Sequence, residues 1–240
     1  MSMVKWRYPL LISALLGLVA IVAAISDGST VQKSGPGESS FQTSIILPPP
    51  HTDGGIYLNK ALEERRSIRT LKNDSLTLET VSQLLWAAQG ITDDKGHRTS
   101  GSAFETYPLE VYVLAGNITN LTAGVYHYIP QNQSIVQVSR GDVRVKFVNT
   151  SVVPANAWIK TAPAIFLITG NFEKVVKKGA ENSTVYIEAG LASENLLLEV
   201  VSLDLGSTYI GGIVPSKAAN FLNLSKEEIP IALLPVGHKA

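Results

Sequence analysis

The sequence predicts an α+β sandwich, in which a central sheet is covered by helices. Strand-like and helix-like segments are interleaved after residue 56. Residues 163–170, PAIFLITG, form a continuous apolar run of strand length, which is typical of a strand buried on both faces. The strongest helical pattern, residues 183–206, is rich in leucine and follows that strand along the chain. A buried strand beside a long apolar helix indicates packed layers around a common core.

The other elements are justified by their periodicity and by their end signals. We expect helices at residues 57–66, 78–89, 142–148, 154–158 and 216–222, and strands at 109–115, 124–128, 135–138 and 229–237. Gly90 is the expected stop of the second helix. The Tyr107-Pro108 pair predicts extended backbone just before the first of these strands. In the long helix, Ser183 or Thr184 is the expected cap and Gly206 the expected end.

Composition and charge narrow the classes of function. The 20 Lys and Arg residues balance 20 Asp and Glu residues, whereas a general nucleic-acid binder has a clustered basic excess. The absence of cysteine excludes disulfides, thiolate metal sites and a cysteine nucleophile. No two of the 4 histidines have metal-ligand spacing, so no protein metal site is predicted.

The beginning of the chain indicates export or membrane attachment. Lys5 and Arg7 precede an uncharged apolar run at residues 10–26. Basic residues before such a run place residues 1–9 in the cytoplasm and the rest of the chain outside the cell. The run is short for a transmembrane helix and slightly long for the core of a signal peptide. We expect a transmembrane anchor, with a cleaved signal segment and a secreted domain as the alternative.

Asparagine usage agrees with an outward-facing domain. Seven of the twelve asparagines begin an Asn-x-Ser/Thr sequon, namely Asn73, Asn117, Asn120, Asn132, Asn149, Asn182 and Asn223. Because Ser and Thr make up about a sixth of the chain, roughly two sequons are expected by chance. The excess predicts a glycoprotein. The alternative is ordinary turn composition, since Asn, Ser and Thr are all common in loops.

A linker separates the N-terminal run from the globular part. Residues 27–55 are polar and rich in Gly and Ser at first, and contain three consecutive prolines at 48–50. Such composition is typical of a flexible linker with a stiffer end. The globular domain is therefore expected to cover residues 56–240.

The basic stretch ERRSIR, residues 64–69, is the first candidate for a ligand site. Arg65 and Arg69 are four residues apart, with Ser67 between them. If the helix continues through this stretch, two guanidinium groups and a hydroxyl suit the oxygens of a phosphate monoester. The alternative is a basic helix end that the helix dipole favours.

Two further stretches offer bare backbone to a ligand. Small residues, among them Ser102 and Ala103, form a loop just before the strand at 109–115, and Gly211-Gly212 lies in GSTYIGGI. Each stretch taken singly is more often a turn. No Walker loop, dinucleotide fingerprint, nucleophile elbow or zinc-protease motif occurs, and no nucleophile–base pair is apparent.

Seven motifs in unbroken order resemble the SagB-type branch of the nitroreductase-like FMN oxidoreductases, over about residues 56–239. They are R-R-S-x-R at 65–69, L-L-W-A-A-Q-G at 84–90, R-T-x-x-S-A-x-x-x-Y-P-L-E-V-Y-V at 98–113, G-V-Y-H-Y at 124–128, E-A-G-x-x-x-x-N-L-L-L at 188–198, G-S-x-x-I-G at 206–211 and L-P-V-G at 234–237.

The resemblance implies a nitroreductase-like sandwich that binds FMN and forms a homodimer with the flavin sites at its seam. It implies these FMN-binding residues: Arg65, Arg66, Ser67, Arg69, Ser102, Ala103, Gly211, Gly212 and Lys239. In this arrangement the arginine cluster holds the phosphate, the Ser102-Ala103 loop follows the flavin edge and the glycine pair lies near the reactive ring. No side chain is assigned a catalytic role.

The chain departs from the family pattern at three places. Phe104 stands where a glycine is usual, and Leu191 stands where a histidine is usual. The sequence ends at Ala240, without the later basic residue that other nitroreductases place on the phosphate.

Two functions from different classes follow. The first is a membrane-tethered, outward-facing FMN oxidoreductase that transfers hydride at flavin N5 by ping-pong exchange, with a small molecule or a modified peptide as substrate. The second is a non-catalytic, glycosylated cell-surface binding domain that retains the fold. Phe104 and Leu191 favour the second function mildly, and the intact arginine cluster favours the first.

Overall fold

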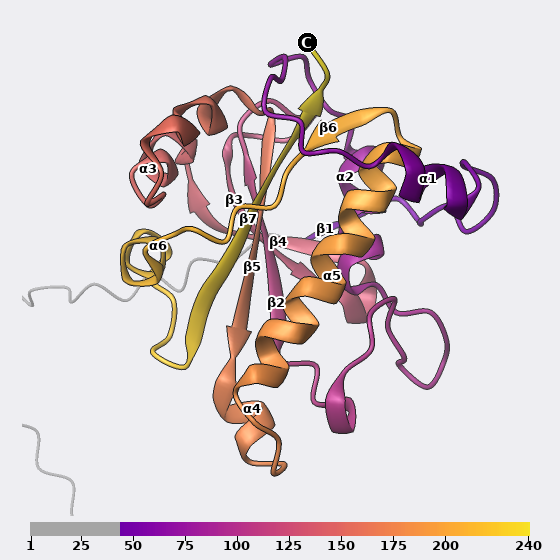
Figure 1. The fold of residues 1–240 in the computed structure, drawn as a ribbon, viewed down its shortest axis with the longest axis vertical. Coiled ribbons are helices and arrows are strands. Elements are labelled where there is room, and N and C mark those ends of the chain that lie inside the picture. The colour runs from indigo at the N-terminus through magenta and orange to yellow at the C-terminus, as the bar shows by residue number, and fades with distance from the viewer. Residues whose placement is uncertain (1–43) are drawn as a thin grey trace, which may run out of the picture. The chain divides into compact units, whose positions relative to one another are not determined.

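The computed structural model describes residues 44–240, which form a seven-stranded antiparallel sheet with helices on both faces (Figure 1). The strand order is β1-β4-β3-β2-β5-β7-β6. The expected anchor at residues 10–26 lies outside the described residues. Within residues 44–240, no helix has the length and apolar character needed to cross a membrane.

The strands are β1 Ser44–Ile46, β2 Leu109–Ala115, β3 Gly124–Ile129, β4 Ser134–Arg140, β5 Ala164–Asn171, β6 Leu205–Ser207 and β7 Glu228–His238. The α-helices are α1 Leu58–Glu64, α2 Leu78–Gln89, α3 Arg144–Val148, α4 Phe172–Val176, α5 Ser183–Ser202 and α6 Pro215–Leu222. Three 3₁₀ helices complete the set, η1 Ala103–Glu105, η2 Pro130–Asn132 and η3 Pro154–Thr161.

The position of β5 in the middle of the sheet explains its continuous apolar sequence. Phe166 and Ile168 face one way and pack in the core beneath α2 and α5. Ile165 and Leu167 face the other way and pack with residues of α3, η3 and α6. Because successive side chains of a strand point to opposite faces, a strand covered on both sides is apolar at every position. The predicted layered sandwich is confirmed (Figure 1).

The long helix differs from its prediction at both ends. Helix α5 ends at Ser202, and Gly206 belongs to β6 instead of ending the helix. A Cβ at Gly206 would come within 2.8 Å of the Ile68 and Leu71 side chains, so close packing explains this glycine. Asn182, rather than Ser183 or Thr184, occupies the N-cap position.

The sheet begins earlier than the expected domain boundary at residue 56. Strand β1, which the sequence places in the linker, pairs with β4 at the edge of the sheet. Leu47 is buried in the core, and the Ser82 hydroxyl donates to the Pro48 carbonyl at 2.6 Å. An added edge strand covers backbone groups of β4 that would otherwise be exposed.

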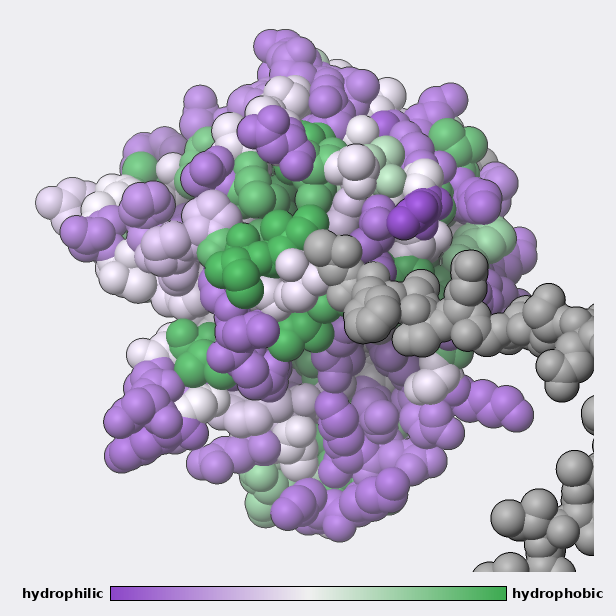
Figure 2. Space-filling view, turned by 180° about the vertical axis from the view of Figure 1, so that it is seen from behind, coloured by the Kyte–Doolittle hydropathy of each residue, from purple (hydrophilic) through white to green (hydrophobic). Residues whose placement is uncertain are grey.

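The side of the domain seen in Figure 2 is largely hydrophilic, with apolar residues gathered near its middle.

Candidate functional site

Helix α1 does not continue through the arginine stretch, so the condition for placing Arg65 and Arg69 on one helix face is not met. The helix ends at Glu64, and Arg65 has the dihedral angles φ −58° and ψ 119°, outside the helical region. The Arg66 guanidinium donates to the carbonyls of Glu63 and Arg65, both at 2.8 Å, and thereby satisfies groups at the helix end. Arg65 and Arg69 therefore are not neighbours on one helix face.

The stretch instead runs beside β6 and the end of β7. The Ile68 amide donates to the Ser207 carbonyl at 2.8 Å, and the Lys72 amide donates to the His238 carbonyl at 2.9 Å. Leu71 pairs with Lys239 in an antiparallel bridge. These backbone contacts bring Arg69 and Lys239 to the same edge of the sheet, although the sequence separates them by most of the domain.

The cations at this edge differ in their partners. Arg65 contacts Glu194 of α5 at 2.9 Å, and Lys239 contacts Asp204 at 2.7 Å. Within residues 44–240, the exposed Arg69 side chain makes neither an ion pair nor a hydrogen bond. Ser67 is exposed beside it. Arg69 is thus more available to an anion than Arg65 or Lys239.

The glycine pair follows along the same edge. Ile210 exchanges two backbone hydrogen bonds of 2.9 Å with Leu233 of β7, while Ser207 pairs with Val236 three residues further on. The glycine pair therefore begins roughly 10 Å along β7 from the arginine segment. A Cβ at Gly211 would lie 2.8 Å from the Tyr209 ring, and one at Gly212 would lie 3.0 Å from Val152, so side chains at these positions would require Tyr209 and Val152 to shift.

One buried hydroxyl at this edge has no partner. The Oγ atom of Ser207 is buried and makes no hydrogen bond to any described residue. Ser207 is the residue of β6 whose carbonyl accepts from Ile68. Buried polar groups are normally satisfied, so an orphaned hydroxyl beside a cationic segment is consistent with a bound ligand.

The loop at Ser102 and Ala103 is held against helix α5. The Ala103 amide donates to the Glu188 carboxylate of α5 at 2.8 Å, and the Glu188 side chain is buried. The Asn195 amide donates to the Thr99 carbonyl at 2.9 Å. The structure brings the arginine segment, Lys239 and the glycine pair to one edge of the sheet, and it ties this loop to α5, the helix that Arg65 also contacts through Glu194.

The loop is strained, and the predicted extended backbone at Tyr107 is wrong. Phe104, Glu105 and Tyr107 have φ angles of 52°, 53° and 42°, each of which costs roughly 1–2 kcal/mol in a residue with a side chain. The Ser102 hydroxyl accepts from the Tyr107 amide at 2.8 Å. The Arg98 guanidinium lies 4.5 Å above the Tyr107 ring, and burial lowers the pKa of Arg98. These contacts hold a backbone that its local sequence disfavours.

Two acidic residues on α5 were missed as site residues from the sequence. Glu188 has a detectable signal, because it falls between Val185, Ala189 and Ala192 on the buried face of the helix. A carboxylate on a buried face must have a hydrogen-bond partner. Glu194 has no such signal, since its role as partner of Arg65 follows only from the break after Glu64.

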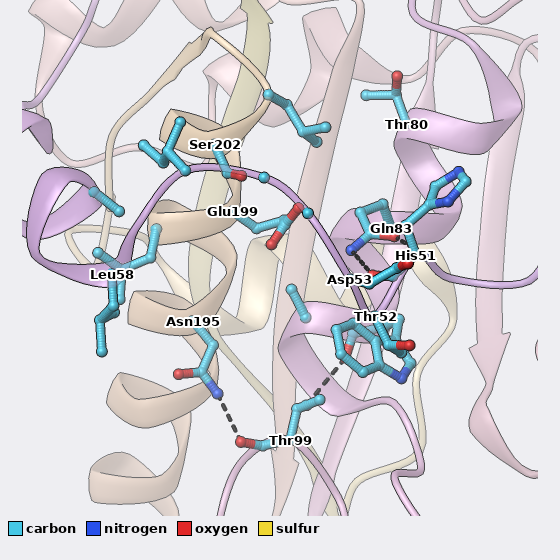
Figure 3. Close-up of a pocket in the computed structure, with 18 of the residues that line it drawn as sticks. His51, Thr52, Asp53, Leu58, Thr80, Gln83, Thr99, Asn195, Glu199 and Ser202 are labelled. Atoms are coloured by element: carbon cyan, nitrogen blue, oxygen red, sulfur yellow. Dashed lines mark hydrogen bonds between the residues drawn. The ribbon is translucent and has the colours of Figure 1, made fainter.

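A cavity of about 750 Å³ lies between α2 and α5, beneath residues 51–56 (Figure 3). Its lining includes the carboxylates of Asp53, Glu79 and Glu199 and contains neither Lys nor Arg. Burial raises the pKa of Glu199, while a hydrogen bond with Gln83 acts in the opposite direction. A lining with three carboxylates and without Lys or Arg does not suit a phosphate, so this cavity is distinct from the cationic edge.

Comparison with known proteins agrees with this architecture. Residues 62–238 match the nitroreductase family. The chain belongs to the nitroreductase family. A nitroreductase-type protein of Methanocaldococcus jannaschii is 33% identical over 186 residues, which cover 77% of this chain and 92% of that protein. Nitroreductase-family proteins are oxidoreductases that generally bind flavin.

Solved structures of nitroreductase-family proteins share the fold. A nitroreductase-type protein of Ralstonia eutropha superposes with a TM-score of 0.71 at 25% identity, over 82% of this chain and 90% of that one. A chain of the Escherichia coli microcin synthetase complex, with truncated pro-MccB17 bound, has a TM-score of 0.64 at 21% identity, covering 82% and 78%. A nitroreductase-type protein of Desulfovibrio desulfuricans, in complex with FMN, has a TM-score of 0.56 at 18% identity, covering 78% and 88%.

Proposed function

We propose that this nitroreductase-family chain is a membrane-tethered, outward-facing FMN oxidoreductase of the SagB type. The observation that carries the proposal is the convergence of Arg69, Lys239 and the bare backbone of Gly211-Gly212 along one edge of the sheet. A cationic end and a side-chain-free stretch on one edge match the two ends of a flavin mononucleotide, a phosphate and a planar ring.

The residues present fit FMN. Arg69 and Lys239 would hold the phosphate, with the Ser67 hydroxyl beside them, while Arg65 and Arg66 would add positive potential at the same end. The exposed amides of Gly211 and Gly212 would face the ring. FMN bound here would supply hydride acceptance and donation at N5. The chain's own part is to bind, orient and shield the cofactor, and no side chain is proposed as a general acid or base.

A homodimer is part of the proposal. The family resemblance implies that the flavin lies at the seam between two copies, and Ser102 and Ala103, which are held against α5 by the Glu188 carboxylate, would contribute to that seam. Helices α1 and α5 also present exposed apolar side chains, including Leu58, Leu62, Ile187 and Leu191. An isologous interface between two copies would cover such side chains.

Location and substrate class rest on separate observations. Lys5 and Arg7 before the apolar run, together with the seven sequons after it, support a domain outside the membrane. The microcin synthetase neighbour holds truncated pro-MccB17. This supports a modified peptide as the substrate, with a small molecule as the other class. Neither class requires nucleic acid.

A second candidate is a non-catalytic, glycosylated binding domain. Phe104 favours it, because this exposed ring at a strained position stands beside the expected flavin edge, where the family has glycine. Visible yellow colour of the purified protein distinguishes the two functions. A colourless protein that stays colourless after incubation with FMN would support the binding domain.

Arg69→Ala tests the flavin assignment. A charge-assisted hydrogen bond contributes roughly 1.5–3 kcal/mol, so loss of Arg69 should weaken FMN binding about ten- to a hundred-fold. Riboflavin lacks the phosphate and should bind the wild type and the variant almost equally. Folding should be unaffected, because the Arg69 side chain is exposed and makes no ion pair or hydrogen bond with the described residues. Fluorescence quenching of both flavins gives the affinities.

Lys178→Ala is the matched control. Lys178 is an exposed cation beyond α4 and away from the arginine segment, so its loss should leave both affinities unchanged. Equal weakening of FMN and riboflavin by Arg69→Ala would place Arg69 against the ring or the ribityl chain instead of the phosphate. Unchanged FMN affinity would remove Arg69 from the site.

A further inference from the structure

We propose that six sequons of the domain carry N-linked glycans and that the seventh, at Asn117, does not. The six are Asn73, Asn120, Asn132, Asn149, Asn182 and Asn223. The inference rests on the outward placement that is part of the proposed function, and it is independent of flavin binding.

Accessibility separates the six sites from the seventh. All six asparagines are exposed, and none of their side-chain amide nitrogens donates a hydrogen bond to another described residue. Asn117 is only partly exposed, and its Nδ2 atom donates to the Asn73 carbonyl at 2.6 Å. Glycan attachment uses this nitrogen, so the fold leaves six of them free and engages the seventh.

Ordinary helix capping does not account for Asn182. This residue stands at the N-cap of α5, yet its side chain makes no capping hydrogen bond. Asn171, which is not in a sequon, does cap its helix, because its Oδ1 atom accepts from the Lys174 amide at 3.2 Å. The sequon asparagine thus lacks the structural role that the other asparagine performs at an equivalent position.

At Asn120 and Asn223, backbone conformation explains only the asparagine of the sequon. Asn120 and Asn223 have φ angles of 61° and 51°, which asparagine tolerates better than most residues. That tolerance accounts for the asparagine alone, and the Thr122 hydroxyl two positions after Asn120 also lies 2.9 Å from the Tyr126 hydroxyl. A glycosylation acceptor requires both residues of the pattern.

No sequon lies within the segments that the proposed function needs, although Asn73 directly follows the arginine segment. No sequon occurs between residues 44 and 72, which contain α1 and the arginine segment, or between residues 76 and 116, which contain α2 and the Ser102-Ala103 loop. None occurs between residues 183 and 222, which contain α5 and the glycine pair. A bulky glycan on any of these surfaces would obstruct the cationic edge or association through α1 and α5.

The modification is a glycosyl transfer to the side-chain amide. The donor is a sugar activated as a phosphate ester at its anomeric carbon. A bond forms between Nδ2 and that carbon, the bond from the carbon to the phosphate oxygen breaks, and the phosphate leaves with the electron pair. The amide proton passes to a base of the transferase.

Peptide mapping by mass spectrometry tests the site map on the full chain, purified from the cells that naturally produce it. We expect glycan mass on the six peptides and none on Asn117. The absence of a glycan from any of the six asparagines, or a glycan at Asn117, would overturn the proposal. Flavin absorbance of the same preparation reports the proposed enzyme separately, so a yellow protein without glycans would contradict only this inference.

Thr184→Ala and Ser183→Ala form a matched pair at Asn182. Thr184 supplies the sequon hydroxyl, whereas Ser183 is the middle residue, and neither side chain makes a hydrogen bond with the described residues. Thr184→Ala should abolish the glycan at Asn182 and Ser183→Ala should retain it. Retention of the glycan in Thr184→Ala would contradict sequon-directed attachment.

Discussion

At the residue scale, two glutamates of α5 show how surroundings assign different roles to the same side chain. The Glu188 carboxylate is buried and accepts the Ala103 amide at 2.8 Å. Glu199 is half-buried at the cavity between α2 and α5, and no described cation pairs with it. The Glu188 carboxylate positions the loop amide that it binds. Burial of the Glu199 carboxylate without a cation instead costs folding free energy.

Glu199→Gln should make stability less dependent on pH. Burial raises the pKa of Glu199 in the folded state above its ordinary value of 4.5. The folded state therefore holds the proton more tightly than the unfolded chain, and the ionised carboxylate opposes folding as the pH rises above 4.5. The variant should gain free energy of unfolding relative to wild type at neutral pH and lose that gain below pH 4.5. Urea unfolding at the two pH values measures it.

Glu79→Gln is the control at the rim of the same cavity. Hydrogen bonds from its own backbone amide and from Thr77 lower the pKa of Glu79, so the sign of the effect is reversed. This substitution should give no gain at neutral pH. A gain for Glu79→Gln equal to that for Glu199→Gln would show that a general charge effect, and not burial, is responsible.

At the element scale, two short segments without regular structure carry most of the candidate site. Residues 65–72 leave the helix after Glu64 and lie beside β6 and the end of β7. The loop from Arg98 to Tyr107 is fixed by contacts with α2 and α5 and contains three residues with positive φ. Scaffold elements that hold strained or irregular segments in this way are typical of functional sites.

Glu188→Ala should loosen the loop, whereas Glu188→Gln should keep it. A hydrogen bond to a charged group contributes roughly 1.5–3 kcal/mol, so amide exchange at Ala103 should accelerate about ten- to a hundred-fold in Glu188→Ala. The Gln side chain retains an oxygen that accepts the Ala103 amide, and protection should largely return. Hydrogen exchange with mass spectrometry over residues 100–107 measures both.

The two variants also separate positioning from general destabilisation. Glu188→Ala should weaken FMN binding if the loop follows the flavin edge, and Glu188→Gln should restore it. Equal exchange rates at Ala103 in the wild type and in Glu188→Ala would show that the loop does not depend on this carboxylate.

At the scale of the whole molecule, the helices on the two faces of the sheet differ in what they leave exposed. Helices α1 and α5 present Leu58, Leu62, Ile187 and Leu191, while the α5 residues facing the sheet, such as Leu196, are buried. Helix α5 thus has more apolar surface than its own domain covers. This surplus favours a second copy.

Ile187→Glu should convert the proposed dimer to a monomer. The Ile187 side chain is 63% exposed, so a charge at this position is tolerated in the monomer but opposes burial in an interface. Light scattering on residues 41–240 should report a dimer for the wild type and a monomer for the variant. FMN affinity should fall with the dimer if the seam holds the flavin.

Val145→Glu is the matched control, because Val145 is 60% exposed on α3 rather than on α1 or α5. It should leave the dimer and its FMN affinity intact. A monomeric wild type at the concentrations used would contradict the homodimer, and the flavin site would then have to lie within one chain.

The sequence by itself determined the elements with strong local periodicity. Helix α2 and strand β2 have the expected bounds, and the apolar pattern of β5 correctly placed it between two layers. The family motifs were also present in the sequence, because they are short and keep their order. These features depend on residues close together along the chain, whose propensities and spacing are visible without the fold.

Only the tertiary structure decided how the site is assembled. The end of α1 at Glu64, the addition of β1 to the sheet and the positive φ of Tyr107 all depend on partners outside the local sequence. Arg69 lies at the same edge as Lys239 because the intervening chain returns through β7, and Ala103 reaches Glu188 across 85 residues. Local preference was overridden wherever long-range hydrogen bonds and packing contributed more free energy than the backbone strain they imposed.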